Sequence, residues 1–90
     1  MEQKIKKQLK TQAHYLSPVI ITGAHGLTPA VQKEIGKALE SHELIKIRLN
    51  AEDRNERKVM IQEILEHHHA ELIQKIGHSV SIYKKNELAG

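Results

Sequence analysis

The stretch VIITGAHGLTPAVQ, residues 19–32, contains in order the signals of a strand, a turn and the start of a helix. Its first three residues are β-branched and continuous, which is typical of a short strand buried on both faces. Gly23 and Gly26 bracket the turn that follows. Thr28 is a favoured N-cap residue, and Pro29 stands at the first helical position, where proline is favoured. The stretch therefore predicts a strand that enters a helix through a glycine-bracketed loop.

The segments around this stretch predict three helices in all. Residues 1–15 carry an apolar stripe at helical spacing, and Pro18 ends that helix because the residue before a proline avoids helical geometry. The helix that begins near Thr28 continues to about residue 42. A third helix is expected from about Asp53, its capping residue, to His68. The apolar stripe of the first helix consists of Ile5, Leu9, Ala13 and Leu16.

Three further segments have the pattern of strands. Residues 44–49 alternate between apolar and basic side chains, with Lys46 and Arg48 on one face. Residues 71–76 and 79–84 flank Gly77-His78, a glycine-first connection that is typical of a type II′ hairpin. The order αβαβαββ predicts an α/β fold with three helices and a mixed sheet of about four strands.

Composition favours one small folded domain over residues 1–90. Hydrophobic residues are 39% of the chain, charged residues 28%, and the net charge is +3. No apolar run approaches the roughly 20 residues of a membrane span, no signal peptide is evident and cysteine is absent, so a cytoplasmic location is expected. Tyr15 and Tyr83 are the only aromatic residues, which argues against modules that stack several bases on aromatic side chains.

The glycine-bracketed loop is suited to a phosphate group. Glycine lets backbone N–H groups approach a ligand, and the start of the next helix offers unpaired donors. The pattern is neither GxGxxG nor a P-loop, whereas a GxxG loop that opens a helix is what KH-type domains use to clamp a nucleic-acid backbone. The same two glycines also fit a plain tight turn, so the spacing alone leaves both interpretations open.

Other candidate chemistry is weak. His67, His68 and His69 are adjacent, so on a helix they fan out and cannot share one ion, and no metal site is expected. His68 falls on the apolar stripe and is expected to be partly buried. No nucleophile signature or cofactor motif is present, so the sequence predicts neither an enzyme nor a bound cofactor.

Two longer segments resemble the YhbY proteins, which are stand-alone CRM (chloroplast RNA splicing and ribosome maturation) domains. The segments are AHYLSPVIITGAHGLTPAVQKEIGKALESHELIKIRL and AELIQKIGHSVSIYK. The shared features, in order, are a helical Ala-His, a Leu-x-Pro, the GxxG-Leu-Thr loop, a His-Glu-Leu-Ile-Lys turn and strand, and an Ile-Gly hairpin before a final tyrosine. The chain departs from the family pattern at Ala24, where a lysine is usual, at Ser17, which is often basic, and at His69, where a glycine is common.

The resemblance implies a fold similar to the C-terminal domain of translation initiation factor 3. It also implies RNA binding without catalysis, in ribosome biogenesis, with ribosomal RNA of a large-subunit precursor as the expected partner. Carried over by position, it marks the loop Gly23, Ala24, His25 and Gly26, together with Ala13, His14, Lys46 and Tyr83.

The sequence therefore predicts a basic RNA-binding surface around the loop. The alternative is a protein-interaction adaptor that docks on ribosomal proteins or on another assembly factor. Besides the four loop residues, the expected RNA-binding side chains are Lys7, Lys10, His14, Lys33, Lys37, Lys46 and Arg48.

Overall fold

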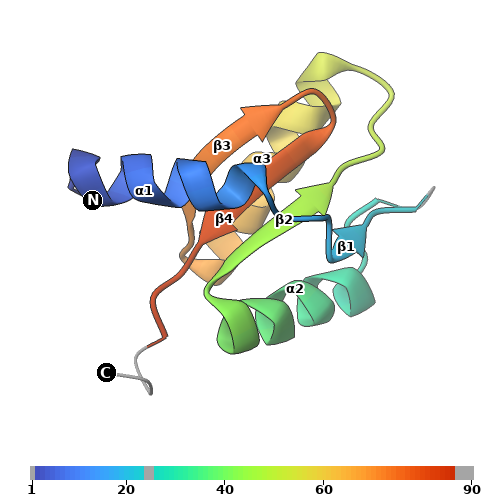
Figure 1. Ribbon diagram of the computed structural model, residues 1–90. Coiled ribbons are helices and arrows are strands. Elements are labelled where there is room, and N and C mark those ends of the chain that lie inside the picture. The colour runs from blue at the N-terminus through green and yellow to red at the C-terminus, as the bar shows by residue number, and fades with distance from the viewer. Residues whose placement is uncertain (1, 24–25, 87–90) are drawn as a thin grey trace.

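The computed structural model describes residues 2–23 and 26–86 of the chain. Its elements follow the predicted order αβαβαββ, which is confirmed (Figure 1). They are α1 (Gln3–His14), β1 (Ile20–Ile21), α2 (Pro29–His42), β2 (Leu44–Arg48), α3 (Arg54–His68), β3 (Glu71–Ile76) and β4 (Ser79–Tyr83). None of the described helices is both long and apolar enough to cross a lipid bilayer.

The four strands form one mixed sheet in the order β1-β2-β4-β3. β1 runs parallel to β2, while β4 is antiparallel to both β2 and β3. β1 and β2 are connected through α2, as a parallel pair requires, and β3 and β4 form a hairpin. The φ angle at the hairpin is positive at Gly77 (+55°) but not at His78, which agrees with the predicted type II′ turn.

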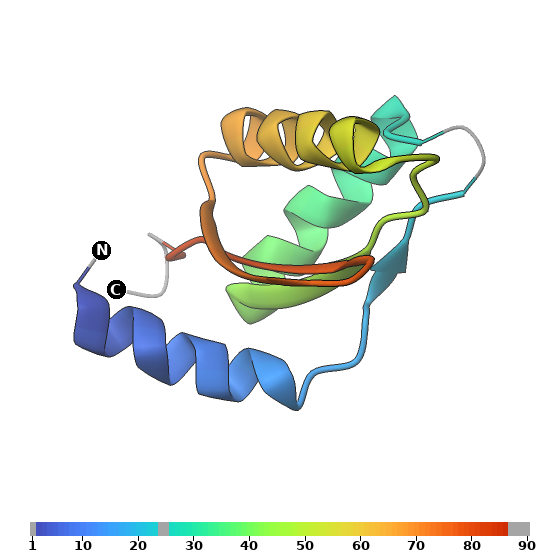
Figure 2. The same ribbon diagram turned by 90° about the horizontal axis from the view of Figure 1, so that it is seen from above.

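Helices cover the two faces of the sheet unequally. α2 and α3 lie together on one face, and α1 alone crosses the other (Figure 2). The larger core lies between the sheet and the α2–α3 pair, where Ile35, Ile47 and Ile64 are fully buried. A smaller cluster lies under α1 and is formed by Leu9, Ala13, Leu44, Ile73 and Tyr83.

The predicted helix caps are confirmed. The Thr28 hydroxyl accepts a hydrogen bond from the Val31 N–H at 3.2 Å, and Pro29 occupies the first helical position. The Asp53 carboxylate accepts the Glu56 N–H at 2.8 Å at the start of α3. α3 ends on His69 in the left-handed region, φ 53° and ψ 42°, where glycine is the more usual residue.

The expectation that the first strand is buried on both faces is wrong. Ile20 is buried, but Ile21 is 61% exposed and Val19 is 54% exposed. The cause is the position of β1: it is an edge strand, and α1 packs on β3 and β2 instead. The stripe on α1 is also covered only in part, because Leu9 and Ala13 are buried while Ile5 is 46% exposed.

Candidate functional site

The glycine-bracketed loop leaves β1 and enters α2. The Gly26 N–H donates to the Gly23 carbonyl at 3.1 Å, which closes the turn. Gly26 has φ +66°, which lies in the left-handed region that favours glycine, whereas the φ of Gly23 lies outside that region. A side chain added at either glycine would meet nothing within 4 Å, so both face open space. The two remaining predicted loop residues, Ala24 and His25, lie outside the described residues.

The start of α2 offers a backbone donor beside this loop. Pro29 has no N–H, the Val31 N–H is taken by the Thr28 hydroxyl, and the Gln32 N–H bonds to the Thr28 carbonyl. The Ala30 N–H therefore remains without a partner among the described residues. A free donor at a helix N-terminus lies in the positive end of the helix dipole.

The loop is anchored to the end of β2 by a pair that the sequence pattern did not reveal. Thr22 is fully buried, and its hydroxyl accepts the Asn50 N–H at 2.9 Å. The Asn50 side-chain amide donates to the Thr22 carbonyl at 2.7 Å, and the Thr22 N–H donates to the Arg48 carbonyl at 3.0 Å. Because the partners are 28 residues apart, only the fold could show that the loop starts beside Arg48.

Lys46 and Arg48 project from β2 onto the side of the sheet away from α2 and α3, because Ile45 and Ile47 point into the core on the other side. Cross-strand partners project to the same face. The strand register therefore identifies the residues on the part of this face that lies beyond α1. We call it the open face; it consists of Ile21, Lys46, Arg48, Gln74, Ile76 and Ser79, together with the buried Ser81.

One side of α1 borders the open face. Lys6, Lys10 and His14 are four residues apart and share that side of the helix. Lys6, Lys7 and Lys10 line a shared hollow near the helix start. His14, at the helix end, lines a hollow on the open face together with Lys46. The structure thus joins the predicted residues Lys10, His14, Lys46 and Arg48 into one basic surface that reaches the start of the loop.

The cations of this surface are unpaired. In the part of the chain that the structure describes, Lys10, Lys46 and Arg48 form no ion pair with a carboxylate. Glu52 and Glu56 line a hollow together with Arg48 at the start of α3. Unpaired surface cations leave their full charge available to an anionic partner.

Lys33 and Lys37 do not join this surface. They are four residues apart on the exposed side of α2, and α2 covers the opposite face of the sheet (Figure 2). The predicted basic residues therefore form two groups, one on α1 and the open face, and one on α2.

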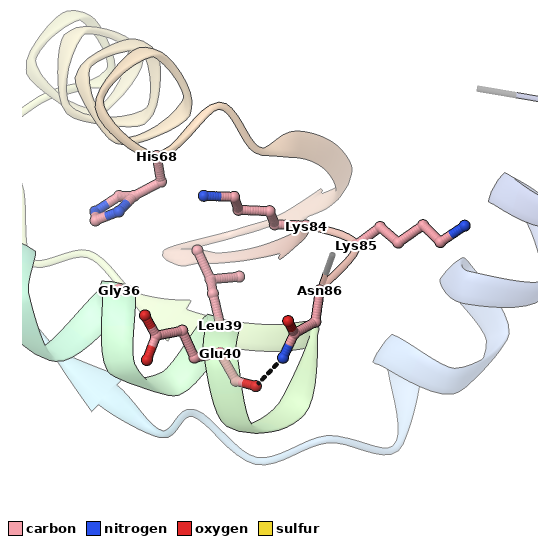
Figure 3. Close-up of a pocket in the computed structure, with 7 residues that line it drawn as sticks. All are labelled: Gly36, Leu39, Glu40, His68, Lys84, Lys85 and Asn86. Carbon is pink, nitrogen blue, oxygen red and sulfur yellow. Dashed lines mark hydrogen bonds between the residues drawn. The ribbon is translucent and has the colours of Figure 1, made fainter. Parts of the chain in front are cut away.

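A second hollow lies away from the open face. It has a volume of about 400 Å³ and lies between α2, the end of α3 and the chain that follows β4. The His68 ring and the Lys84 side chain extend into it, whereas Lys85 points away (Figure 3). The Asn86 side-chain amide closes one side by donating to the Glu40 carbonyl at 2.9 Å.

His68 is a structural residue of this region, as its place on the apolar stripe predicted. Its side chain is buried, and Nε2 donates to Gln32 Oε1 at 2.8 Å, which links α3 to α2. Burial lowers the pKa of His68 below the ordinary 6.5, and the charges of His67 and Lys84 lower it further. Among the described residues, no three His, Cys, Asp or Glu side chains are placed to hold a metal ion.

Comparison with known proteins places the chain in a family. The family model of the CRS1/YhbY (CRM) domain matches residues 1–84. A relative from Pseudomonas aeruginosa, named "Probable RNA-binding protein", is 38% identical over 86 residues, which are 96% of this chain and 83% of the relative. A Haemophilus influenzae relative named "RNA-binding protein" is 39% identical over 89 residues, 99% of this chain and 90% of the relative.

The fold is also similar to a solved structure. The solution structure of a hypothetical protein from Staphylococcus aureus matches with a TM-score of 0.81 and 29% identity, covering 94% of this chain and 88% of that one. The sequence motifs, the element order and these matches agree: the chain belongs to the CRS1/YhbY (CRM) domain family.

Proposed function

We propose that this protein binds RNA along the strip that runs from the Gly23–Gly26 loop across Arg48, Lys46 and His14 to Lys10. The observation that carries the proposal is the gathering of unpaired cations from α1 and β2 beside a loop with open space around its glycines. Family membership and the names of the bacterial relatives support it.

The chemistry of the strip suits a sugar-phosphate backbone. The free Ala30 N–H beside the loop supplies a backbone donor, and Lys10, Lys46 and Arg48 supply positive charge. Contacts of this kind position an RNA without reading its sequence. Lys33 and Lys37 would extend the contact to RNA that passes the loop and follows α2. No reacting group is needed for this function, and none of the relatives described above is named as an enzyme.

The client RNA that we propose is ribosomal RNA in a precursor of the large subunit, as the resemblance to the YhbY proteins implies. The experiment is crosslinking and sedimentation of the tagged protein in cell extract at low and moderate salt. Co-migration with large-subunit precursors, with crosslinks between residues 23–26 and ribosomal RNA, is the expected result. Migration as free protein without RNA crosslinks would contradict the proposal.

A protein-interaction adaptor is the second candidate, and the apolar part of the open face favours it. Ile21 and Ile76 are both more than half exposed there. Salt dependence separates the two functions. RNA contacts by Lys10, Lys46 and Arg48 would give log K against log salt a slope of about −2, at roughly −0.7 per neutralised phosphate of a single strand. Docking through the apolar side chains would give a much shallower slope.

A further inference from the structure

We propose that the hollow on the open face is a pocket that reads one unpaired RNA base. This inference rests on the proposed RNA binding and adds sequence preference to it. The hollow has a volume of about 200 Å³ and is lined by His14, Lys46, Gln74, Ile76, Ser79 and Ser81. Typical small-molecule pockets have about 300–1,000 Å³, so this one has room for a single flat ring rather than for a larger cofactor.

A β-bulge aims Gln74 into this hollow. The register of β3 against β4 shifts between Leu72 and Gln74, so that Gln74 is the partner of Ser81. In a regular strand, successive side chains alternate between faces, and Ile73 and Gln74 would point apart. Here Ile73 is buried under α1 with Leu9 and Ala13, and Gln74 lines the hollow on the same face. Bulges recur beside functional sites because they redirect a side chain in this way.

The Gln74 amide is left unsatisfied by the fold. Its Oε1 is buried and has no hydrogen-bond partner among the described residues. A buried acceptor without a partner costs roughly as much as its lost hydration, so the Gln74 amide gains a hydrogen bond if it turns toward a ligand in the hollow. The terminal torsion of a glutamine is soft, and its rotation can turn either the carbonyl oxygen or the amino group toward the hollow.

The surroundings complete the features that base recognition needs. An amide offers a donor and an acceptor in one plane, which matches the edge of a base, as bidentate glutamine contacts to adenine do in DNA. The hydroxyls of Ser79 and Ser81 stand beside it, and the exposed Ile76 side chain and the His14 ring supply flat or apolar surface. Lys46 and Arg48 lie on the same face, where the phosphates that flank an inserted base would pass.

The test compares Gln74→Ala with the wild type in binding to short, labelled homopolymer RNAs of each base. Gln62→Ala is the matched control, because Gln62 is exposed on α3 across the sheet, where its side-chain amide donates to Glu66 at 2.9 Å. We expect the wild type to prefer one base, and Gln74→Ala to bind the RNA of that base about 5- to 150-fold more weakly. Affinity for the other RNAs and the salt slope should stay unchanged, because Gln74 contacts no phosphate.

Three other outcomes are decisive. Equal loss on every RNA, or no base preference in the wild type, would refute the base pocket and leave the proposed RNA binding intact. No RNA binding by the wild type would refute both. As a readout that needs no variant, NMR should show the Gln74 side-chain amide resonances shifting on addition of the nucleoside monophosphate of the preferred base, while those of Gln62 stay in place. Equal or absent shifts would contradict the pocket.

Discussion

The same substitution at the two loop glycines should have different consequences, and we develop Gly23→Val and Gly26→Val as a pair. Gly26 has φ +66°, and an L-residue in the left-handed region costs roughly 1–2 kcal/mol. In a chain of this size, each kcal/mol shifts Tm by about 4–8 °C. Gly26→Val should therefore lower Tm by roughly 4–16 °C.

Gly23 carries no such constraint. Its φ lies outside the left-handed region, and an added side chain meets nothing within 4 Å. We expect Gly23→Val to change the free energy of unfolding by no more than about 0.5 kcal/mol. If a phosphate passes close to the loop backbone, however, the isopropyl group must displace it. Loss of one charge-assisted hydrogen bond, about 1.5–3 kcal/mol, would weaken RNA binding roughly 10- to 150-fold.

Thermal unfolding, monitored by circular dichroism, measures Tm. The anisotropy of a labelled RNA at fixed salt measures the affinity for RNA. Gly23→Ala is a graded control, because a methyl group occupies less of the space over the loop and should weaken binding less than valine does. Wild-type affinity in a folded Gly23→Val protein would refute the idea that RNA approaches this loop. An unchanged Tm in Gly26→Val would refute the conformational argument.

Three further predictions address Gly36, His68 and Lys46. Gly36→Ala should raise stability by about 0.5–1 kcal/mol through helix propensity, since the new Cβ meets the His68 ring at an ordinary 3.6 Å; a lower Tm would mean that the ring cannot accept it. Because the pKa of His68 is lowered in the folded protein, its contribution to stability is fully present above pH 6.5. That contribution is lost progressively as the pH falls through the lowered pKa. Urea unfolding at neutral and mildly acidic pH should show this loss, and His68→Gln should lessen it; equal loss in both proteins would assign it to other groups. Lys46→Met should make the RNA salt slope shallower by about 0.7, while Lys58→Met, exposed on α3, should not; equal effects would indicate only nonspecific attraction.

Much of the fold could be predicted from local patterns, because each local signal agreed with its neighbours. Thr28-Pro29 and Asp53 start their helices as capping chemistry requires, and Gly77 turns the hairpin. The exposed side of β1 and the bulge at Gln74 could not be predicted, since both depend on what other segments cover or pair with. The Thr22–Asn50 link is of the same kind, because its partners meet only after the sheet has formed.

The open face follows from the geometry of covering a sheet with helices. A helix is about 10 Å wide with its side chains, whereas a strand of five or six residues is about 17–20 Å long. Two helices can cover one face of such strands, but the single helix α1 crosses the other face (Figure 2) and leaves Arg48 and Ile76 exposed. The exposure of the β2 side chains on this face increases along the strand. Leu44 is buried under α1, Lys46 is half-buried at the border of the helix, and Arg48 is exposed beyond it. A partner that reaches the sheet must therefore meet the half that carries the cations and Gln74, and the loop anchored beside Arg48 lies at the end of that same half.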